Sequence, residues 1–578
     1  MRRAAGRLAL CLLFVLLLPA AHAATVQVAL DGLPPTLTES VLATLDIGAE
    51  ARRERVSPAR IRRAHTAAPQ QIRTALEASG YYRATVESSL REGKDGWQAH
   101  YRVERGEPLR VTRLDLIVTG PGSRDPALQA ALPAFPLQVG SRLRHARYEE
   151  GKRALLETLQ EHGYPDAAFT THRVQVDLDA YTAQVTLTLD SGAPYRFGEL
   201  SLPDTVVDES LLRRYGAPQP GEPYSVARLL EYQSALGDSG YFAGVEVQAG
   251  SRDRAAHTVP VTVTLTPRPR SAYSAGVGFA TDSGPRLRAG QQRRYVNRRG
   301  HTLDNALLLS PRDSELSTRY RVPLADPRTE QLSFGAVARR EDTVSARSDS
   351  LTLQTAVTRR RGVGRRTVGL DYLVERFDTG GDEATSRLLI PSLGWQGTRS
   401  DNPLWPRRGW RLDLSLRGAL AGLLSDLSLV QARAAGKYVY GVGRDQRLLG
   451  RLDLGSTWVD GFGELPASLR FFAGGDQSVR GYDYEKLGPR DGDGDVVGGR
   501  HLLVASLEYE WMFAGDYGGA LFLDAGNAFT GTRLNLARGA GIGFRWRSPI
   551  GAVRLDLASA ISEPGSPLRL HITVGPDL

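Results

Sequence analysis

Cysteine is almost absent from this chain: Cys11 is the only one in 578 residues. A single cysteine cannot form an internal disulfide, and without residues 1–23 the chain has no thiolate nucleophile and no cysteine-based metal site. Catalytic motifs are missing as well. There is no Gly-x-Ser-x-Gly, no P-loop and no His-Glu-x-x-His, and the 10 histidines are scattered. We therefore expect no enzyme activity, no bound metal and no cofactor.

Long hydrophobic runs are lacking beyond the N-terminus. The apolar run Leu8–Leu18 follows three arginines and precedes Ala21–Ala23, which has the small-x-small form of a cleavage site. This pattern predicts a cleaved signal peptide over residues 1–23. No later run reaches the about 20 apolar residues of a transmembrane helix. Two classes remain: a soluble exported protein, and a β-barrel whose strands alternate apolar and polar residues.

The excess of positive charge is small. The formal net charge is +9, and the predicted signal peptide carries three arginines and no acidic residue, so the rest carries 9 − 3 = +6. A charge of this size, spread along so long a chain, does not indicate a nucleic-acid partner.

The first half of the chain contains a repeated unit. Three segments of helical periodicity end in Gly-Tyr, at residues 72–81, 154–164 and 232–241. Each glycine falls where a helix commonly ends in a left-handed residue. Alternating strands precede and follow these segments. We therefore predict three units of the order strand–helix–helix–strand–strand, with boundaries at residues 24–107, 108–191 and 192–269.

From residue 270 to residue 578 the pattern changes to short alternating segments separated by turn residues. In Leu568–Val574, for example, apolar residues occupy one face, and Arg569, His571 and Thr573 occupy the other. We expect about 16 antiparallel strands, an even number that is usual for an outer-membrane β-barrel. A barrel of this size is wide enough to leave a wet lumen. A soluble sandwich would instead place the apolar face inward and the charges outward.

One glycine-rich loop interrupts the strands, Phe471–Tyr482, with Arg480 near its end. In the two strand segments that follow, Glu508 and Asp524 fall on the polar, lumen-facing side together with Phe522. We predict that Val479, Arg480, Gly481 and Tyr482 form a latch inside the lumen. The predicted latch partners are Asp524, Glu508, Phe522 and Gly526. A buried guanidinium–carboxylate pair would be stronger than one on the surface. The alternative is a solvated arginine in an external loop.

Two further glycine-rich motifs do not indicate ligand sites. Gly539–Gly543 superficially resembles a dinucleotide-binding loop, but it lies within a strand pattern and opens no helix. Asp491–Asp495 begins like a calcium-binding loop, although Val496 stands where glycine is needed and Leu502 where glutamate is needed. We expect a flexible acidic loop there, and cation binding stays open.

The Val479–Tyr482 motif, following three tandem repeats, resembles the POTRA-barrel (BamA/TamA-like) superfamily. Proteins of this superfamily insert or export outer-membrane proteins. The similarity is most detailed to the TamA-like subgroup, whose members are outer-membrane subunits of the translocation and assembly module. It extends over Phe471–Tyr482, Ser506–Tyr509, Phe522–Gly526, Gly543–Gly551, Val574–Leu578, Gly276–Pro285 and Tyr195–Gly198.

The resemblance implies a barrel in the cell outer membrane with POTRA domains in the periplasm. It also implies a TamB-like inner-membrane partner, outer-membrane β-protein clients that include autotransporters, and a contribution to phospholipid passage. A lateral gate is implied where the first and last barrel strands pair weakly. The gate residues would be Tyr273, Gly276, Gly278, Leu570, Ile572 and Val574. Pro576 has no N–H group, so pairing at the end of the last strand should be short.

Assembly of clients through such a gate is one hypothesis among several. A two-partner secretion pore would instead pass one unfolded client through the lumen. A passive porin would have no use for a periplasmic arm of three repeats. A soluble β-protein would not fractionate with outer membranes.

Overall fold

The computed structural model describes residues 25–50, 57–93, 96–280, 284–343, 345–548 and 551–575. The predicted signal peptide lies outside the described residues, as do Pro576 and Leu578. Contacts divide the chain into two compact units. The first comprises the first two repeats and part of the third, and the second comprises residues 201–217 and 230–248 of the third repeat together with the barrel.

The first repeat is a three-stranded sheet with helices packed against it. Its elements are β1 (Thr25–Asp31), α1 (Pro35–Thr44), α2 (Asp46–Glu50), α3 (Pro58–Ala78), β2 (Thr85–Gly93) and β3 (Gly96–Glu104). The sheet order is β1-β3-β2, with β1 parallel and β2 antiparallel to β3. Apolar residues one or more turns apart on α3, including Ile61, Ile72 and Leu76, are fully buried in one core with Tyr101 of β3.

The second and third repeats have the same order of elements. The second comprises β4 (Arg110–Thr119), η1 (Pro121–Arg124), α4 (Pro126–Ala131), α5 (His145–Glu161), β5 (Ala168–Asp177) and β6 (Thr182–Asp190). The third comprises β7 (Arg196–Ser201), α6 (Glu209–Arg214), α7 (Val226–Asp238), β8 (Phe242–Ala249) and β9 (Thr258–Pro267). Their sheets run β4-β6-β5 and β7-β9-β8, so β2, β5 and β8 are corresponding edge strands.

The predicted glycines end the helices as expected. Gly80, Gly163 and Gly240 have φ angles of +87°, +96° and +82°, in the left-handed region that glycine adopts without strain. In the first repeat, the single first helix that was predicted is divided into α1 and α2. Among the described residues, no helix combines the length and the apolar character needed to cross a bilayer.

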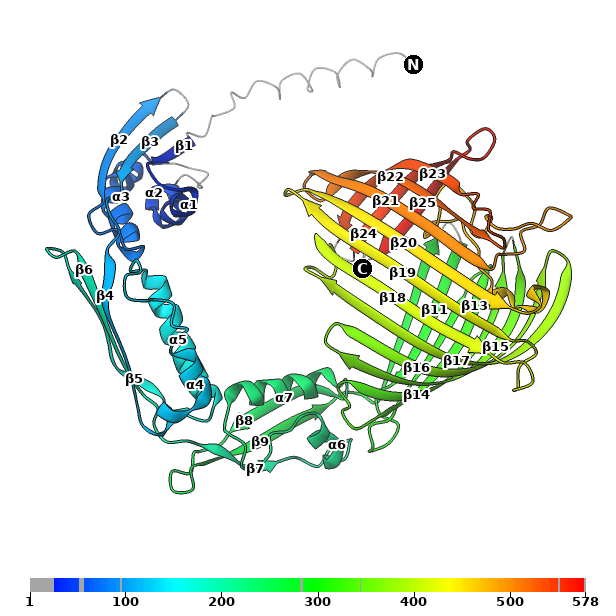
Figure 1. The fold of residues 1–578 in the computed structure, drawn as a ribbon, viewed down its shortest axis with the longest axis horizontal. Coiled ribbons are helices and arrows are strands. Elements are labelled where there is room, and N and C mark those ends of the chain that lie inside the picture. Colours follow the sequence, from blue (N-terminus) through cyan, green and yellow to red (C-terminus); the bar gives the residue numbers. More distant parts are fainter. Residues whose placement is uncertain are drawn as a thin grey trace, which may run out of the picture. The chain divides into compact units, whose positions relative to one another are not determined.

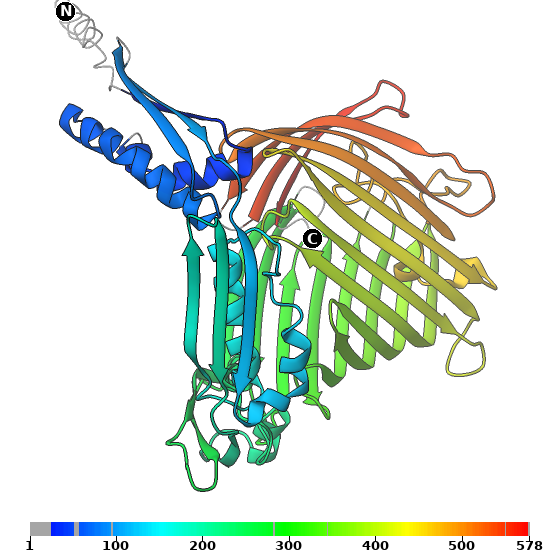
Figure 2. The ribbon, with the colours of Figure 1, turned by 60° about the vertical axis from the view of Figure 1, so that its left-hand side comes forward.

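The remaining strands form a single sixteen-stranded sheet, in agreement with the predicted number. Its strands are β10 (Ser271–Ala280), β11 (Gly284–Arg293), β12 (Thr302–Leu309), β13 (Asp313–Pro323), β14 (Glu330–Asp342), β15 (Arg347–Arg361), β16 (Gly364–Thr379), β17 (Asp382–Ser400), β18 (Arg408–Ala419), β19 (Leu429–Val442), β20 (Gln446–Val459), β21 (His501–Ala514), β22 (Tyr517–Phe529), β23 (Ala537–Ser548), β24 (Gly551–Ala560) and β25 (Leu568–Gly575). Each strand pairs antiparallel with the next, and the strands curve round a common interior (Figures 1 and 2).

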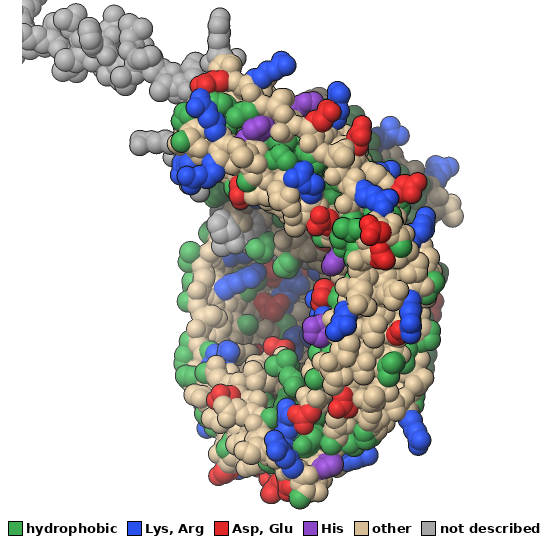
Figure 3. All heavy atoms as spheres, turned by 90° about the vertical axis from the view of Figure 1, so that its left-hand side faces the viewer, with side chains coloured by type: hydrophobic (Ala, Val, Ile, Leu, Met, Phe, Trp, Pro, Cys, Tyr) green, Lys and Arg blue, Asp and Glu red, His purple; other side chains and the backbone are tan. Residues whose placement is uncertain are grey.

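The two faces of this sheet have opposite character. Large apolar side chains such as Leu507, Leu521 and Ile542 are about 60% exposed on the outer face. Charged residues at alternate positions, such as Asp524 and Arg545, are fully buried on the inner face. Figure 3 shows a hollow in whose depth acidic and basic side chains are visible. This arrangement is that of a membrane barrel with a polar interior, and it excludes the soluble sandwich.

The third repeat contacts the barrel within the second unit. Arg298, in the turn between β11 and β12, donates to Asp208 at 3.0 Å and to Asp204 at 2.5 Å. The hydroxyl of Tyr241 donates to the carbonyl oxygen of Gly300 in the same turn, at 2.6 Å, and is buried there. These contacts fix residues of the third repeat to the end of the barrel at which the chain enters it.

The sheet begins at β10 and ends at β25, and the described residues of these two strands have no pairing with each other. All six predicted gate residues lie in these strands. Tyr273 and Val574 project outward and are 76% and 58% exposed. Side chains built at Gly276 and Gly278 would meet nothing within 4 Å. The predicted effect of Pro576 falls outside the described residues.

Candidate functional site

The predicted latch loop is the segment between β20 and β21. It contains two short 3₁₀ turns, η2 (Phe462–Glu464) and η3 (Ala467–Leu469), and it packs against the inner wall of the barrel. Val479 is fully buried, and Arg480 and Tyr482 are 5% and 4% exposed. The loop therefore lies inside the barrel, and the alternative of a solvated arginine in an external loop is wrong.

Backbone geometry explains why glycine follows the arginine. Gly481 has a φ angle of +97°, and a side chain there would collide with the backbone of Ser559 and Ala560 on β24. Only glycine meets both requirements at once. The loop can thus lie directly on the wall of the barrel, which brings the Arg480 side chain to the carboxylates.

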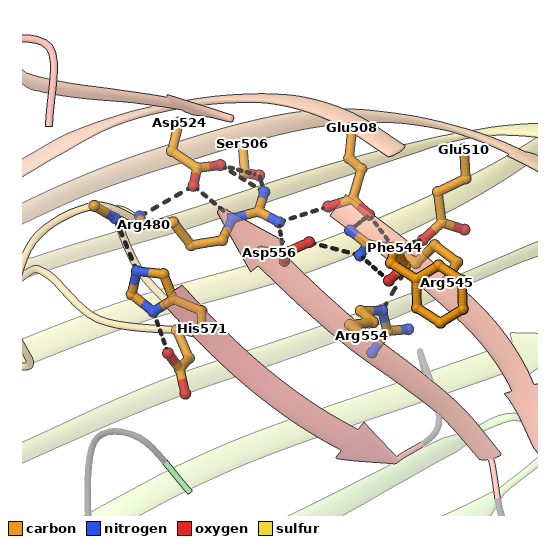
Figure 4. Close-up of polar contacts among 12 residues, drawn as sticks. Arg480, Ser506, Glu508, Glu510, Asp524, Phe544, Arg545, Arg554, Asp556 and His571 are labelled. Carbon is orange, nitrogen blue, oxygen red and sulfur yellow. Dashed lines mark hydrogen bonds and ion pairs between the residues drawn. The ribbon is translucent and has the colours of Figure 1, made fainter. Parts of the chain in front are cut away.

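Arg480 forms the predicted ion pairs with both candidate partners. Its Nε and Nη2 donate to the two carboxylate oxygens of Asp524 at 2.8 and 3.0 Å, and its Nη1 donates to Glu508 at 2.8 Å. The Arg480 guanidinium also lies 3.5 Å from the ring centroid of Phe522. These contacts confirm the predicted positions of Asp524, Glu508 and Phe522. Figure 4 shows the two carboxylates beside the Arg480 guanidinium.

The guanidinium of Arg480 is fully satisfied. In addition to its bonds to Asp524 and Glu508, Nη1 donates to Asp556 at 2.9 Å and Nη2 donates to Ser506 at 3.4 Å. An arginine has five N–H donors, and here there is an acceptor for each. The backbone N–H of Arg480 also donates to Asp524, at 3.1 Å. The group is held in place and leaves no donor for a ligand.

A second arginine, Arg545 of β23, extends the network. It is fully buried and donates to Glu508 at 2.5 Å, to Glu510 at 2.7 Å and to Asp556 at 2.6 Å. Alternation of apolar and polar residues along β23 and β24 is enough to assign Arg545 and Asp556 to the inner face, but it does not reveal that they meet Glu508. That contact brings together side chains from β21, β23 and β24, and no local period of the sequence reports it.

The loop is also tied to the last strands of the sheet. The backbone N–H of Gly481 donates to Nε2 of His571 on β25 at 3.0 Å, and Nδ1 of the same ring is hydrogen-bonded to Asp476. Asp483 pairs with Arg569 of β25. The sequence did not predict that His571 contacts the loop, although alternation placed its side chain on the polar face of the strand. The loop therefore fastens to a strand that ends the sheet.

Glycines on β23 make room for these contacts. A side chain at Gly539 would overlap the carbonyl oxygen of Arg480, and one at Gly541 would overlap the backbone of Leu557 and crowd the ring of Phe522. The glycine motif of this strand is therefore a surface on which the loop lies. The predicted contact of Gly526 with the loop is not supported, because a side chain there would meet Leu503 and Val504 of the neighbouring strand.

The rest of the loop reaches the opposite part of the wall. Glu375 of β16, which is fully buried, accepts from the backbone N–H of Ser468 at 3.1 Å. Arg470 donates to the hydroxyl of Thr379 and to the carbonyl of Val497, each at 2.9 Å. The loop thus bridges β16 and the last strands across the interior.

The acidic stretch Asp491–Asp495 forms a local turn. Oδ1 of Asp491 accepts from the backbone N–H groups of Asp493 and Asp495, at 3.0 and 2.9 Å. Within the described ranges, no three histidine or acidic side chains are grouped so as to hold a metal ion. The buried network around Arg480 and Arg545 consists of ion pairs that position the loop.

Parts of this chain match known protein families and known outer-membrane proteins. The model of the Omp85 superfamily domain matches residues 300–575, and that of POTRA domain TamA domain 1 matches residues 27–105. The chain is 37% identical over 124 residues to the outer membrane protein assembly factor BamA of Nitratidesulfovibrio vulgaris, covering 20% of this chain and 16% of that protein. It is 22% identical over 387 residues to BamA of Neisseria meningitidis serogroup B, covering 60% of this chain and 48% of that protein.

The chain thus spans less than half the length of these curated relatives. Among solved structures, BamA of Haemophilus ducreyi lacking POTRA domains 1–3 aligns with a TM-score of 0.67 at 18% identity, covering 81% of this chain and 99% of that one. At this identity the structural match concerns the fold.

Proposed function

Because this chain belongs to the Omp85 superfamily and carries a first POTRA domain of the TamA type, we propose that it inserts β-barrel or autotransporter clients into the outer membrane. Its barrel is an outer-membrane barrel, and its POTRA domains are periplasmic. The proposal involves no enzymatic step and no cofactor. The client would use the edges of the sheet rather than a reactive group.

The observation that carries the proposal is that the sheet starts at β10 and ends at β25, with no pairing between the described residues of these two strands. Unpaired N–H and C=O groups at a strand edge are costly in hydrocarbon, and a client strand would satisfy them by pairing. The loop bound to His571 would meanwhile hold β25 in position from inside the barrel. The edge of β25 would then be held in one position, so that a client strand could pair with it.

A disulfide between β10 and β25 tests this mechanism. The chain has no cysteine other than Cys11, so a pair can be introduced against a clean background. Tyr273→Cys combined in turn with Leu570→Cys and Val574→Cys places both thiols on the outer face. We expect oxidised pairs that cross-link to abolish client insertion, measured as protease-resistant, heat-modifiable client in the membrane. Reduction should restore insertion.

A matched control locks strands that are already paired. Ala289 and Leu307 are direct neighbours in the β11–β12 register and lie on the outer face, so a cysteine pair there should leave insertion unchanged. Full insertion by the β10–β25 cross-linked protein would contradict the gate. A two-partner secretion pore predicts full activity of the cross-linked protein, because its client passes through the lumen and does not need the β10 and β25 edges to be open.

We also propose that the periplasmic repeats bind a TamB-like inner-membrane partner. The supporting features are the TamA-type first domain and its exposed edge strand β2, which can accept an added strand. A photo-crosslinker at Ser89 of β2 should capture an inner-membrane protein. The same group at Gln248, on the corresponding edge strand β8, is the control. Equal yields at the two sites, or none at Ser89, would contradict docking at the first domain.

A further inference from the structure

The outer wall of the barrel has a shallow apolar depression across β16 to β22, with a volume of ≈ 820 Å³. Along it runs a row of residues that are direct neighbours from strand to strand: Arg366, Trp395, Leu414, Ala434 and Leu454. Most of the side chains that line it project to the outer face. The depression therefore faces the lipid bilayer rather than the lumen.

The depression exists because small side chains lie between large ones. Ala432 and Ala434 on β19 are flanked by Leu414 and Leu416 on β18 and by Leu454 on β20. These three leucines are between 40% and 46% exposed. An apolar trough of this kind fits an acyl chain, since a methylene chain buried against it gains favourable transfer free energy.

One end of the depression has an interfacial character. The rings of Trp395 and Trp410 are stacked, with centroids 6.3 Å apart and an angle of 12° between their planes. They lie against the wall because Gly364 and Gly397 leave room for them, and side chains at either glycine would overlap an indole ring. Tryptophan at such a position is typical of the boundary between acyl chains and headgroups.

Arginines surround this tryptophan pair. Arg366 borders the depression, and Arg361 and Arg399 project from the same outer face of β15 and β17. All three are exposed, and the described part of the chain supplies none of them with an ion-pair partner. By contrast, Arg359 on the same hairpin is paired with Glu330 at 3.1 Å.

Topology places these arginines at the periplasmic side of the membrane. The chain enters the sheet from the third POTRA domain at Ser271, and the strands alternate in direction. The hairpin at Gly362 and Val363 therefore lies at the same end of the barrel as Ser271. Lipid headgroups of the periplasmic leaflet are at this level.

We propose that the depression is a binding site for a glycerophospholipid with an anionic headgroup from the periplasmic leaflet. One acyl chain lies over Ala432 and Ala434, the glycerol region lies at Trp395, and the phosphate is bound by Arg366 and Arg399. Charge complementarity selects this occupant, because several unpaired guanidinium groups at the end of an apolar trough match an anionic headgroup with its chains. The inference depends on the position of the barrel in the membrane and not on client insertion.

Native mass spectrometry of the full-length protein in detergent tests the site. The probes are dioleoyl phosphatidylglycerol and, for comparison, dioleoyl phosphatidylcholine. We expect phosphatidylglycerol to be retained preferentially. The Arg366→Ala/Arg399→Ala variant should lose retention by roughly fivefold for each arginine removed. Ala434→Trp, which fills the trough, should lower the retention of both lipids.

Arg293→Ala is the matched control, because Arg293 is an exposed arginine on the outer face at the periplasmic end of β11, away from the depression. Its retention of phosphatidylglycerol should equal that of the unaltered protein. Equal retention of the two lipids, an equal loss with Arg293→Ala, or no effect of Ala434→Trp would overturn the proposal. Cross-linking of the trough to a second copy of the chain in place of lipid would also overturn it.

Discussion

Replacing Arg480 by alanine is expected to destabilise the folded barrel more than any other single change in the loop. The substitution would leave Asp524, Glu508 and Asp556 buried without the guanidinium that now binds all three. Removing one partner of a buried ion pair typically costs about 3–5 kcal/mol. The measurement is the urea concentration at which the folded, heat-modifiable form is lost, together with client insertion at a temperature where the variant remains folded.

Two other arginine variants make the prediction specific. Arg490→Ala removes an exposed arginine of the same loop, and we expect little change because its interactions are at the surface. Arg480→Lys retains the charge but loses the two-point bond to Asp524, so it should be intermediate. Equal stability of Arg480→Ala and Arg490→Ala would show that the buried network does not hold the loop.

Exchanging the charges of Arg480 and Asp524 should not restore stability. If Arg480 bound Asp524 alone, exchanging the two charges would partly recover stability. In the structure, an aspartate at position 480 would lie beside Glu508 and Asp556, which both accept from the present guanidinium. Repulsion among these carboxylates removes the expected benefit.

Gly539→Val is expected to displace the loop from the wall without altering any charge. The added side chain would overlap the carbonyl oxygen of Arg480, and a backbone atom cannot move aside as a flexible side chain can. Overpacking of this kind costs about 1–3 kcal/mol, and occasionally more. We expect faster proteolysis within the loop and a lower yield of inserted client, while the barrel still reaches the outer membrane.

Gly450→Ala is the control for this change. Gly450 is also in a barrel strand, β20, but a side chain there would meet nothing within 4 Å. Its stability and loop proteolysis should match those of the unaltered protein. If Gly539→Val behaved like Gly450→Ala, the loop would not lie on β23 in the functional state.

Arg480→Ala and Gly539→Val both test the contacts between the loop and the last strands of the sheet. Arg480 is bound to β21, β22 and β24, and Gly481 is bound to His571 of β25. On the proposed mechanism, loss of either contact frees the end of the sheet at which a client strand would pair. We therefore expect both variants to impair insertion before they impair targeting.

Much of this molecule follows from short-range patterns in its sequence. Period-two alternation assigns each side chain of a strand to one face, so it correctly placed Glu508 and Asp524 inside. The helical segments ending at Gly80, Gly163 and Gly240 predicted three like domains. The pairing of Arg480 with Asp524 and Glu508 could also be predicted from the sequence. These carboxylates lie on the inward face of β21 and β22, the two strands that directly follow the loop.

Only the tertiary structure decided which inward side chains meet. Asp556 and His571 are 76 and 90 residues from their partners in the loop, and they reach it because the sheet curves round and the loop returns across the interior. Alternation reports the face of a residue and not its height along the strand. The level of a residue along the barrel axis depends on strand register, and the contacts of the loop depend on its path across the interior. The same two features bring the loop onto the glycines of β23. Strand register also lines up the side chains that form the depression on the outer wall.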